Sequence, residues 1–357
     1  MMTARTLLRC LAGVSLAALS ALGFAAPAAA GDELNALVWC DHADPALLKP
    51  FEDANNVHVN VKEFEGTGAG LAIVEQSQPG DWDVMVIDSI DVHRGAEKNL
   101  FEPLPEDKLP FADLFPQVVM DAVTKIGGKR YGITEKFGYN TIGYNKTKVD
   151  VAGMQSLAAM TDAKYKGRIA IYDYYLPVIG LAAMAIGKKT SELTEADLPA
   201  IKDVLLKMKA NAKAVTDVAA SQTALATGEA DILVGGGEWV TAGIAKDKPE
   251  LDFSIPKEGA VLWSQSLAMF KDSKHKDLAL KFIQYIVGPE GQARLATSSC
   301  YWGMPANSKA ALDADQKRIL RFDEQPEFLK RAQPYPAPNE ALDKKMQDMW
   351  TEVLQAK

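Results

Sequence analysis

Aromatic and acidic side chains recur in this sequence at the points where short apolar runs end. The residues that could contact a ligand at these points are Trp39, His42, Asp88, Asp173, Tyr174, Glu238, Trp239 and Trp263. Aromatic faces attract cations and also stack on apolar stems, and carboxylates neutralise ammonium groups. Any single tryptophan fits core packing equally well, but the set as a whole predicts a site for a small cationic organic ligand.

Signals for catalysis are weak. No G-x-S-x-G or H-E-x-x-H motif occurs. The residues 273–276 fit S-x-x-K, but they lie in a charged loop before a helix and are interpreted as a solvated turn. The glycines at 66–68 lack dinucleotide spacing and a P-loop lysine, so they are interpreted as a helix start that could still hold an anion. We predict a binding protein without catalytic residues or cofactor, and keep a secreted enzyme as a lesser hypothesis.

Composition limits the class of protein. The chain has 357 residues, 48% of them hydrophobic, with 39 Lys+Arg against 47 Asp+Glu and a formal charge of −8. This length allows one large domain or two lobes, and the apolar content excludes a disordered chain. An acidic balance argues against nucleic-acid binding, which needs a basic face. Four His and three Cys are too few for a zinc or iron–sulfur scaffold, so no metal site is predicted.

The first 30 residues have the pattern of a cleaved secretory signal. Arg5 and Arg9 precede the apolar stretch Leu11–Phe24, and small residues at 28–30 place cleavage after Ala30. A retained membrane anchor is the alternative, but the apolar run is short. No later stretch approaches 18 apolar residues. We therefore expect a periplasmic product whose formal charge is −10, because cleavage removes two arginines.

Cys40 and Cys300 remain after cleavage. In an oxidising compartment, two cysteines that meet in space form a disulfide. Sequence alone leaves open the alternative of two separate buried thiols. We predict the disulfide.

Apolar strands alternate with amphipathic helices after residue 30, which is typical of an α/β protein. Expected strands cover 34–39, 57–64, 83–87, 168–172 and 231–234, and expected helices cover 45–55, 66–78, 198–209, 276–287, 289–296 and 342–355. Several of these strands run into polar or glycine-rich turns. Ligand sites in open α/β sheets gather at such carboxyl ends.

A series of segments resembles the spermidine/putrescine-binding periplasmic proteins, the solute-binding components of ABC importers. The series is V-W-C-D-H at 38–42, Y-G-I-T-E-K-F-G at 131–138, I-G-Y-N at 142–145, Y-K-G-R-I-A-I at 165–171, P-K-E-G-A-V-L-W-S-Q-S-L-A at 256–268 and G-M-P-A-N at 303–307. The likeness covers nearly the whole mature chain. No single segment is decisive, but their order is specific.

The resemblance implies a two-lobed periplasmic binding protein of type II character, with hinge strands and a ligand cleft between the lobes. It implies a first lobe of residues 31–137 with 256–310 and a second of 138–255 with 311–357. It also implies a monomer that passes a small amine or amino-acid-like ligand to an ABC permease in the inner membrane.

Several site residues carry over by position, and some depart from the family. Trp39 and Trp263 match stacking aromatics, and Glu238 matches a carboxylate of the putrescine-binding branch. Other expected positions differ, with His42 where Tyr is usual, Asp88 where a small hydroxyl residue is usual, and Gln265 where the family has an amine-binding Asp. Since an unpaired buried ammonium is costly, we expect a ligand with one or two positive centres, such as a diamine, a quaternary amine or a zwitterion.

A ferric-ion-binding periplasmic protein is the alternative. Tyr174 and Tyr175, with His42 nearby in the predicted site, resemble the paired tyrosines of such proteins, and oxygen ligands suit Fe³⁺. The other interpretation is that adjacent tyrosines merely flank a strand end.

Overall fold

The computed structural model describes residues 32–337 and 339–356. The predicted signal peptide, with cleavage after Ala30, lies outside these residues. The strands are β1 (Asp32–Val38), β2 (Val57–Glu63), β3 (Val84–Asp88), β4 (Lys125–Ile126), β5 (Lys129–Arg130), β6 (Ile133–Asn145), β7 (Ile169–Tyr172), β8 (Ala212–Thr216), β9 (Ile232–Gly236), β10 (Leu251–Ser254), β11 (Ala260–Met269), β12 (Met304–Pro305) and β13 (Ala332–Pro334).

Helices connect these strands and cover both faces of the sheet. They are α1 (Pro45–Asn55), α2 (Thr67–Gln76), α3 (Val92–Glu97), α4 (Asp121–Thr124), α5 (Tyr175–Ala185), α6 (Leu198–Asn211), α7 (Val218–Thr227), α8 (Glu238–Thr241), α9 (Lys276–Val287), α10 (Pro289–Ala296), α11 (Ala314–Leu320), α12 (Gln325–Leu329) and α13 (Glu340–Gln355). None of the helices within the described ranges is long and apolar enough to cross a membrane.

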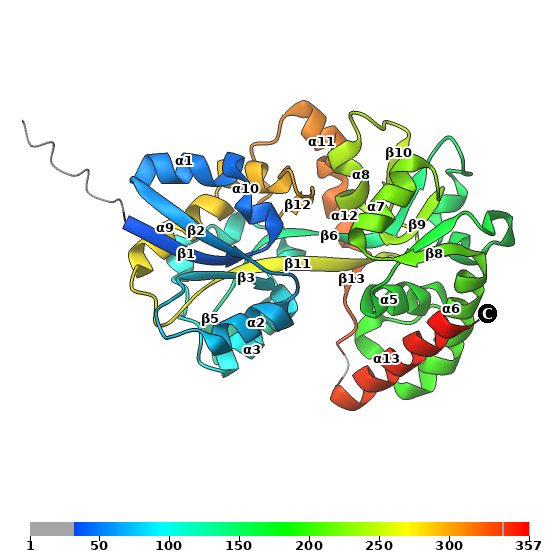
Figure 1. Ribbon diagram of the computed structural model, residues 1–357, viewed down its shortest axis with the longest axis horizontal. Coiled ribbons are helices and arrows are strands. Elements are labelled where there is room, and N and C mark those ends of the chain that lie inside the picture. Colours follow the sequence, from blue (N-terminus) through cyan, green and yellow to red (C-terminus); the bar gives the residue numbers. More distant parts are fainter. Residues whose placement is uncertain (1–31, 338, 357) are drawn as a thin grey trace, which may run out of the picture.

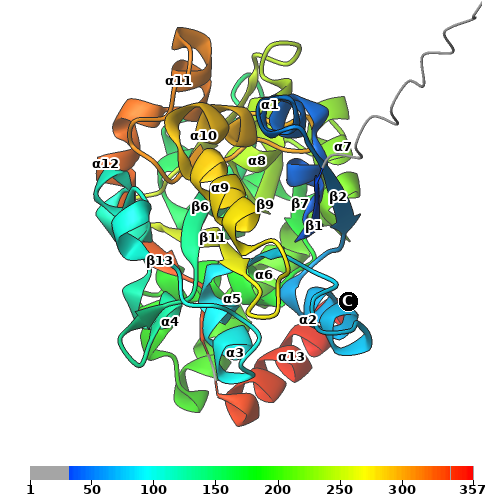
Figure 2. The ribbon, with the colours of Figure 1, turned by 90° about the vertical axis from the view of Figure 1, so that its left-hand side faces the viewer.

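The main sheet runs in the order β2-β1-β3-β11-β6-β9-β7-β8, with β10 and β12 beside β6 and β13 beside β11. In its first half, β1 is parallel to both β2 and β3. Side chains alternate between faces, so Ala36 and Val38 pack in one core with α1 and α9, whereas Leu37 packs in another with α2. Figures 1 and 2 show α1, α9 and α10 on one side and α2 and α3 on the other.

The second half of the sheet forms its own lobe. Its strands β9, β7 and β8 are parallel, and Figure 1 shows α5, α6 and α13 on one side with α7 and α8 on the other. Helix α5 is apolar all round, and Val178–Met184 is buried against the sheet. A helix without a polar face is a core helix, and α13 covers it from outside.

Two long strands cross between the lobes (Figure 1). Strand β6 pairs with β11 over Ile133–Asn140 and with β9 over Thr141–Tyr144. Strand β11 pairs with β3 in the first lobe and with β13 near its own start. Continuous strands that join two cores are suited to hinge bending between lobes.

The segment after residue 310 passes from one core to the other. Leu320, Phe322 and Phe328 pack in the first core, whereas Tyr335 and α13 pack in the second. We propose that this third passage lies at β13, later than the boundary expected at residue 311.

Each strand and helix predicted from the sequence pattern corresponds to an element of the structure, but α5 and α7 were not predicted. Helices α1, α9 and α10 have the expected bounds, and the prediction of an α/β fold is confirmed. Helix α2 ends at Gln76, two residues earlier than expected, because the Ser77 backbone is extended (φ −94°, ψ 164°) and its hydroxyl donates back to the Ile73 carbonyl at 2.8 Å.

Candidate ligand-binding site

The two halves of the sheet turn the carboxyl ends of their parallel strands towards each other. Strand β3 ends at Asp88, which pairs with Gln265 of β11. Strand β9 ends at Gly236, which pairs with Thr141 of β6. Trp263 lies between these levels and pairs with Gly138. Since ligand sites of α/β sheets lie at carboxyl ends, this geometry locates the candidate site between the lobes.

Aromatic rings line the second-lobe side of this site. Tyr172 lies edge-on to Tyr174 at 6.0 Å and to Trp239 at 5.5 Å between ring centroids. Tyr174 in turn lies 5.8 Å from Tyr335. These rings come from the ends of β7 and β9 and from the segment after β13, so their contacts join three chain segments at one place. Such a set can enclose an apolar stem or an organic cation.

A second aromatic group lies on the crossing strand and the first lobe. The Trp263 ring is 6.1 Å from that of Tyr301. Trp39 follows β1 and is partly buried against the first-lobe cores. The indole N–H groups of Trp39, Trp239 and Trp263 are buried, and none has a hydrogen-bond partner among the described residues. Buried donors normally find a partner, so these three could serve an acceptor group on a ligand.

Asp88 is the carboxylate of the first lobe that faces this site. Its Oδ2 accepts a hydrogen bond from the Thr67 hydroxyl at 3.0 Å. Burial, and then the neighbouring Asp91, raise the pKa of Asp88 to about 7. After burial, the charge of Asp88 is the next cause that raises the pKa of Tyr174. Asp88 therefore acts electrostatically on Tyr174 of the second-lobe aromatic group, and it forms no ion pair within the described part of the chain.

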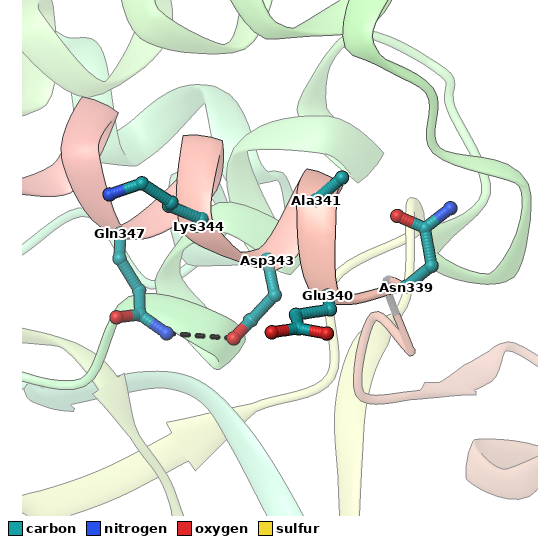
Figure 3. A pocket seen from close by; sticks show the side chains of 6 residues that line it. All are labelled: Asn339, Glu340, Ala341, Asp343, Lys344 and Gln347. Atoms are coloured by element: carbon teal, nitrogen blue, oxygen red, sulfur yellow. Dashed lines mark hydrogen bonds between the residues drawn. The ribbon is translucent and has the colours of Figure 1, made fainter.

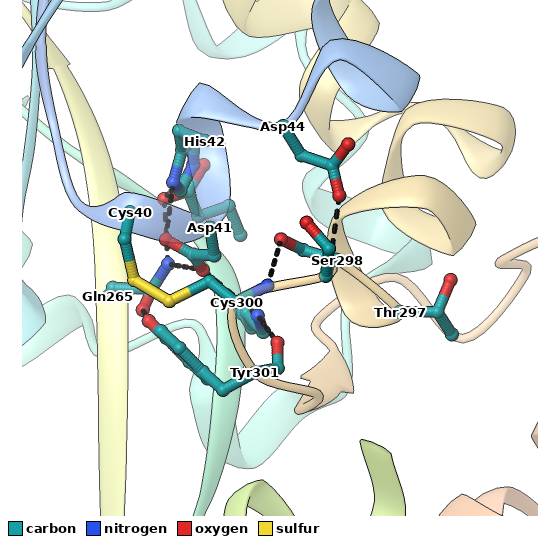
Figure 4. A network of polar contacts seen from close by, with 12 residues as sticks. Cys40, Asp41, His42, Asp44, Gln265, Thr297, Ser298, Cys300 and Tyr301 are labelled. Carbon is teal, nitrogen blue, oxygen red and sulfur yellow. Dashed lines mark hydrogen bonds and ion pairs between the residues drawn. A yellow bond between two sulfur atoms is a disulfide. The ribbon is translucent and has the colours of Figure 1, made fainter. Parts of the chain in front are cut away.

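A buried ionic network lies beside Tyr301 (Figure 4). His42 Nδ1 is 2.9 Å from Asp41 Oδ1, and His42 Nε2 is 2.9 Å from Glu135 Oε1. Lys136 Nζ donates to Asp41 Oδ2 at 2.9 Å. Burial opposes ionisation here, but Lys136 and His42 hold the pKa of Asp41 well below its usual range. Against the same burial, Glu135 and Asp41 raise the pKa of His42 to about 10.

Gln265 belongs to this network. Its Nε2 donates to Asp41 Oδ2 at 3.0 Å, and its Oε1 accepts from the Tyr301 hydroxyl at 2.9 Å. His42 and Gln265, expected to contact ligand, are thus fully buried in intramolecular contacts. The reason is electrostatic, because the Asp41 carboxylate attracts the donors of His42, Lys136 and Gln265.

The predicted disulfide is confirmed. Cys40 and Cys300 are bonded, with 260 residues between them. Figure 4 shows the bond beside the buried network. The disulfide holds the turn after β1 against the loop that carries Tyr301, so both sides of the network are fixed by one covalent link.

Glu238 supports the crossing strand. Its two carboxylate oxygens lie 3.1 and 3.2 Å from the Tyr139 backbone N–H, and burial raises its pKa to about 8. This contact requires glycine at the preceding position, 138, since a Cβ on Gly138 would lie 1.7 Å from Glu238 Oε1 and 2.5 Å from the Trp263 ring. Glu238 thus sits behind Trp263, rather than in a solvent-facing position.

The three residues after β7, Asp173, Tyr174 and Tyr175, contact different partners. Asp173 is exposed, and its Oδ1 accepts from Trp350 Nε1 of α13 at 2.9 Å. Tyr175 donates to Asp343 Oδ1 at 2.7 Å, whereas Tyr174 faces the aromatic group. Burial, followed by the hydrogen bond to Asp343, raises the pKa of Tyr175 to about 12, which disfavours the tyrosinate that Fe³⁺ binds. Within 32–337 and 339–356 no cluster of His, Cys, Asp and Glu could hold a metal ion.

A surface hollow of about 620 Å³ lies elsewhere, at the start of α13, where Figure 3 shows Gln347 hydrogen-bonded to Asp343. A second hollow lies between α1 and β2, beside Glu52 and His58. None of the predicted ligand residues lines either hollow, so the interlobe site is defined by its strand ends and aromatic groups.

Sequence reasoning missed several residues of this region, among them Tyr172, Glu135, Lys136, Tyr301 and Tyr335. For Glu135 and Lys136 a signal was present, because two adjacent charged residues occur inside β6, all of whose residues are buried. Charged side chains are almost never buried unless paired. Tyr301 and Tyr335 gave no comparable signal, since Tyr301 follows an irregular segment and Tyr335 follows the three-residue strand β13.

Comparison with known proteins agrees with the fold and the expected resemblance. The family model described as "Bacterial extracellular solute-binding protein" matches residues 46–324. The spermidine/putrescine-binding periplasmic protein of Escherichia coli is 24% identical over 80% of this chain and 82% of its own length. A putrescine/cadaverine-binding protein of Pseudomonas aeruginosa is 23% identical over 92% of this chain and 95% of its own.

Solved structures show the same architecture. The substrate-binding protein of a spermidine/putrescine ABC transporter from Streptococcus pneumoniae superposes with a TM-score of 0.78 at 21% identity, covering 91% of this chain and 99% of that one. The prediction of a two-lobed binding protein is therefore confirmed. These comparisons give no support to the ferric-ion hypothesis.

Proposed function

This chain belongs to the bacterial extracellular solute-binding protein family, and we propose that it captures a small organic amine between its lobes and delivers it to an ABC permease. The relatives reported above are named for putrescine, spermidine and cadaverine. We extend to this chain only the chemical class, a short organic molecule with a protonated amine. Solute binding does not require turnover, and we expect none.

The observation that carries the proposal is Asp88. A partly buried carboxylate with a pKa raised to about 7 is unfavourable for folding when it is ionised. Its charge acts on Tyr174, an aromatic residue of the other lobe. An ammonium group would supply the missing positive charge, and the aromatic rings would cover the attached carbons. Binding residues often cost stability in this way.

We further propose which predicted residues contact the ligand. Asp88, Tyr174, Trp239 and Trp263 form the contact set, with Trp39 at the first-lobe margin. His42, Gln265 and Glu238 act from behind by fixing these positions, and Asp173 serves to attach α13. The protein acts as a monomer in the periplasm after removal of residues 1–30.

Thermal-shift screening of the mature protein tests this function. A ligand at 1,000 times its Kd adds about 4 kcal/mol to the stability of the native state. The panel should contain monoamines, diamines, quaternary amines, amino acids and amine-free sugars. We expect melting shifts with primary amines at pH 8. The proposal would be contradicted if only sugars shifted the melting temperature, or if no compound with an amine shifted it.

A further inference from the structure

Three polar side chains lie at one level of three neighbouring strands in the first lobe. Asp88 of β3 pairs with Gln265 of β11, and Gln265 pairs with Lys136 of β6. Cross-strand neighbours project from the same face of a sheet. Asp88, Gln265 and Lys136 therefore form a row, which we call the polar row, with a free carboxylate at one end and an ammonium at the other.

The Lys136 ammonium is held as a bound organic cation would be. It donates to Asp41 Oδ2 at 2.9 Å and to the Tyr301 carbonyl at 3.0 Å. It also lies 4.0 Å from the centroid of the Tyr301 ring. A carboxylate, a carbonyl oxygen and an aromatic face are the partners with which proteins bind alkylammonium groups.

At the Lys136 end of the polar row, the charges of the protein side chains balance one another. Asp41 and Glu135 are balanced by His42 and Lys136, and all four side chains are fully buried. Gln265 is committed to Asp41 and Tyr301. A second ligand ammonium near Lys136 would meet a positive charge. Each carboxylate there is already matched by a cation, although Glu135 Oε2 has no hydrogen-bond partner among the described residues, so burying a further charge at this end is costly.

The Lys136 side chain and the Trp263 ring both pack against Gly303. A Cβ on Gly303 would lie 2.6 Å from Lys136 Cε and 3.0 Å from the Trp263 ring. The lysine stem is therefore packed in the interior near Trp263 and is fully buried, in contrast with a solvent-exposed lysine that could swing away.

We propose that Lys136 is a specificity-determining residue whose own ammonium occupies the second cation position of the site, so that the protein selects ligands with one ammonium over diamines. This inference rests on the proposed function. The single ligand ammonium binds Asp88, and the far end of the ligand carries a neutral or acceptor group. The unpartnered indole N–H groups of Trp39 and Trp263 suit such an acceptor.

The direct test compares two ligands of equal length in the unaltered mature protein. Isothermal titration calorimetry at pH 8 with 4-amino-1-butanol and 1,4-diaminobutane separates one ammonium from two. We expect the amino alcohol to bind at least about tenfold more tightly, which corresponds to roughly 1.4 kcal/mol. Tighter binding of the diamine would overturn the inference while leaving the proposed function intact. If neither compound nor any other amine bound, the proposed function itself would fail.

A variant then tests the residue. In Lys136→Met the internal ammonium is gone and Asp41 is left for a ligand cation, so the preference should move towards the diamine by about tenfold or more. Lys164→Met is the matched control, because Lys164 also lies over a tyrosine ring, at 5.0 Å, and pairs with Asp162, but on the exposed surface. It should leave the preference unchanged. An unchanged preference in a folded Lys136→Met protein would refute the role of Lys136.

The Gln265→Asp variant provides a second readout. If Gln265 alone determined specificity, this change would restore diamine binding. According to our inference the new carboxylate pairs with Lys136, so Gln265→Asp alone gains little and the double variant with Lys136→Met gains the diamine. A full gain in the single variant would contradict the inference.

Discussion

Replacing Asp88 by asparagine should stabilise the unliganded protein and weaken amine binding. Asp88 accepts a hydrogen bond from Thr67, but within the described ranges no cation pairs with it. Burial, and then Asp91, raise its pKa to about 7. Asparagine has nearly the same shape and carries no charge, so the variant isolates the electrostatic contribution.

The magnitude follows from the pKa. A shift from 3.8 to about 7 corresponds to at most about 4 kcal/mol at pH 8. Because Asp88 is partly exposed and solvent screens its charge, we expect a gain of ~1–2 kcal/mol, or roughly 2–4 °C in Tm. The folded state binds more protons than the unfolded state, so wild-type stability should fall as pH rises from about 4 to 7. The stability of Asp88→Asn should not fall over this pH range.

Amine binding should change in the opposite direction. Removing one partner of a buried charge pair costs ~2–4 kcal/mol, so Kd should rise by roughly 30- to 1,000-fold. Below pH 7 the wild-type carboxyl takes up a proton that an ammonium ligand must displace. Wild-type affinity should therefore weaken by up to about tenfold per pH unit below 7, whereas the variant should show little dependence on pH.

Urea denaturation at pH 5 and pH 8, together with calorimetric titration of a primary amine, measures both effects. Asp53→Asn is the control, because Asp53 forms an exposed ion pair with Lys49 on α1 and should change neither quantity. Lower stability of Asp88→Asn at pH 8, or an amine Kd within about twofold of wild type, would refute the reasoning.

Three further predictions concern the frame of the site. Reducing the Cys40–Cys300 bond, or replacing both residues by serine, should lower stability by up to about 5 kcal/mol in the chain-entropy model for so long a loop. Urea denaturation midpoints with and without reductant would measure this loss, and equal midpoints would contradict the prediction. Gly138→Ala should lower the stability by ~1–3 kcal/mol because its Cβ would overlap Glu238. Thermal melting would measure this loss, and an unchanged Tm would show that Glu238 moves away from the new Cβ without cost. The raised pKa of His42 contributes stability that is complete below about 6.5 and lost as pH rises towards 10; His42→Gln should flatten that slope in denaturation curves, and an unchanged slope would assign the pH dependence to another group.

Local signals in the sequence predicted the elements because they depend on neighbouring residues. Helix α1 begins at Pro45 after Asp44, whose carboxylate accepts from the Ala46 N–H at 2.8 Å, and this is the capping pattern expected for a helix start. The disulfide prediction rested on two expectations from the sequence, an oxidising compartment and only two cysteines after cleavage of the predicted signal peptide.

The roles of the site residues were harder to predict because they depend on distant partners. Nothing near Gln265 in sequence indicates that Asp41 and Tyr301 would take both ends of its amide. Asp173 follows a strand end, as a ligand residue would, but α13 arrives 177 residues later and supplies Trp350. Strand ends indicate where a site lies, whereas the assignment of each side chain requires the tertiary structure.

The central claim is that this chain binds a small organic amine between its lobes through Asp88. Isothermal titration calorimetry of the mature protein with one primary amine, at pH 8 and again at pH 5.5, tests it most directly. We predict saturable binding at pH 8 that weakens by at least about tenfold at pH 5.5 as Asp88 is protonated. Equal affinity at both pH values, or no binding of amines at either, would contradict the account.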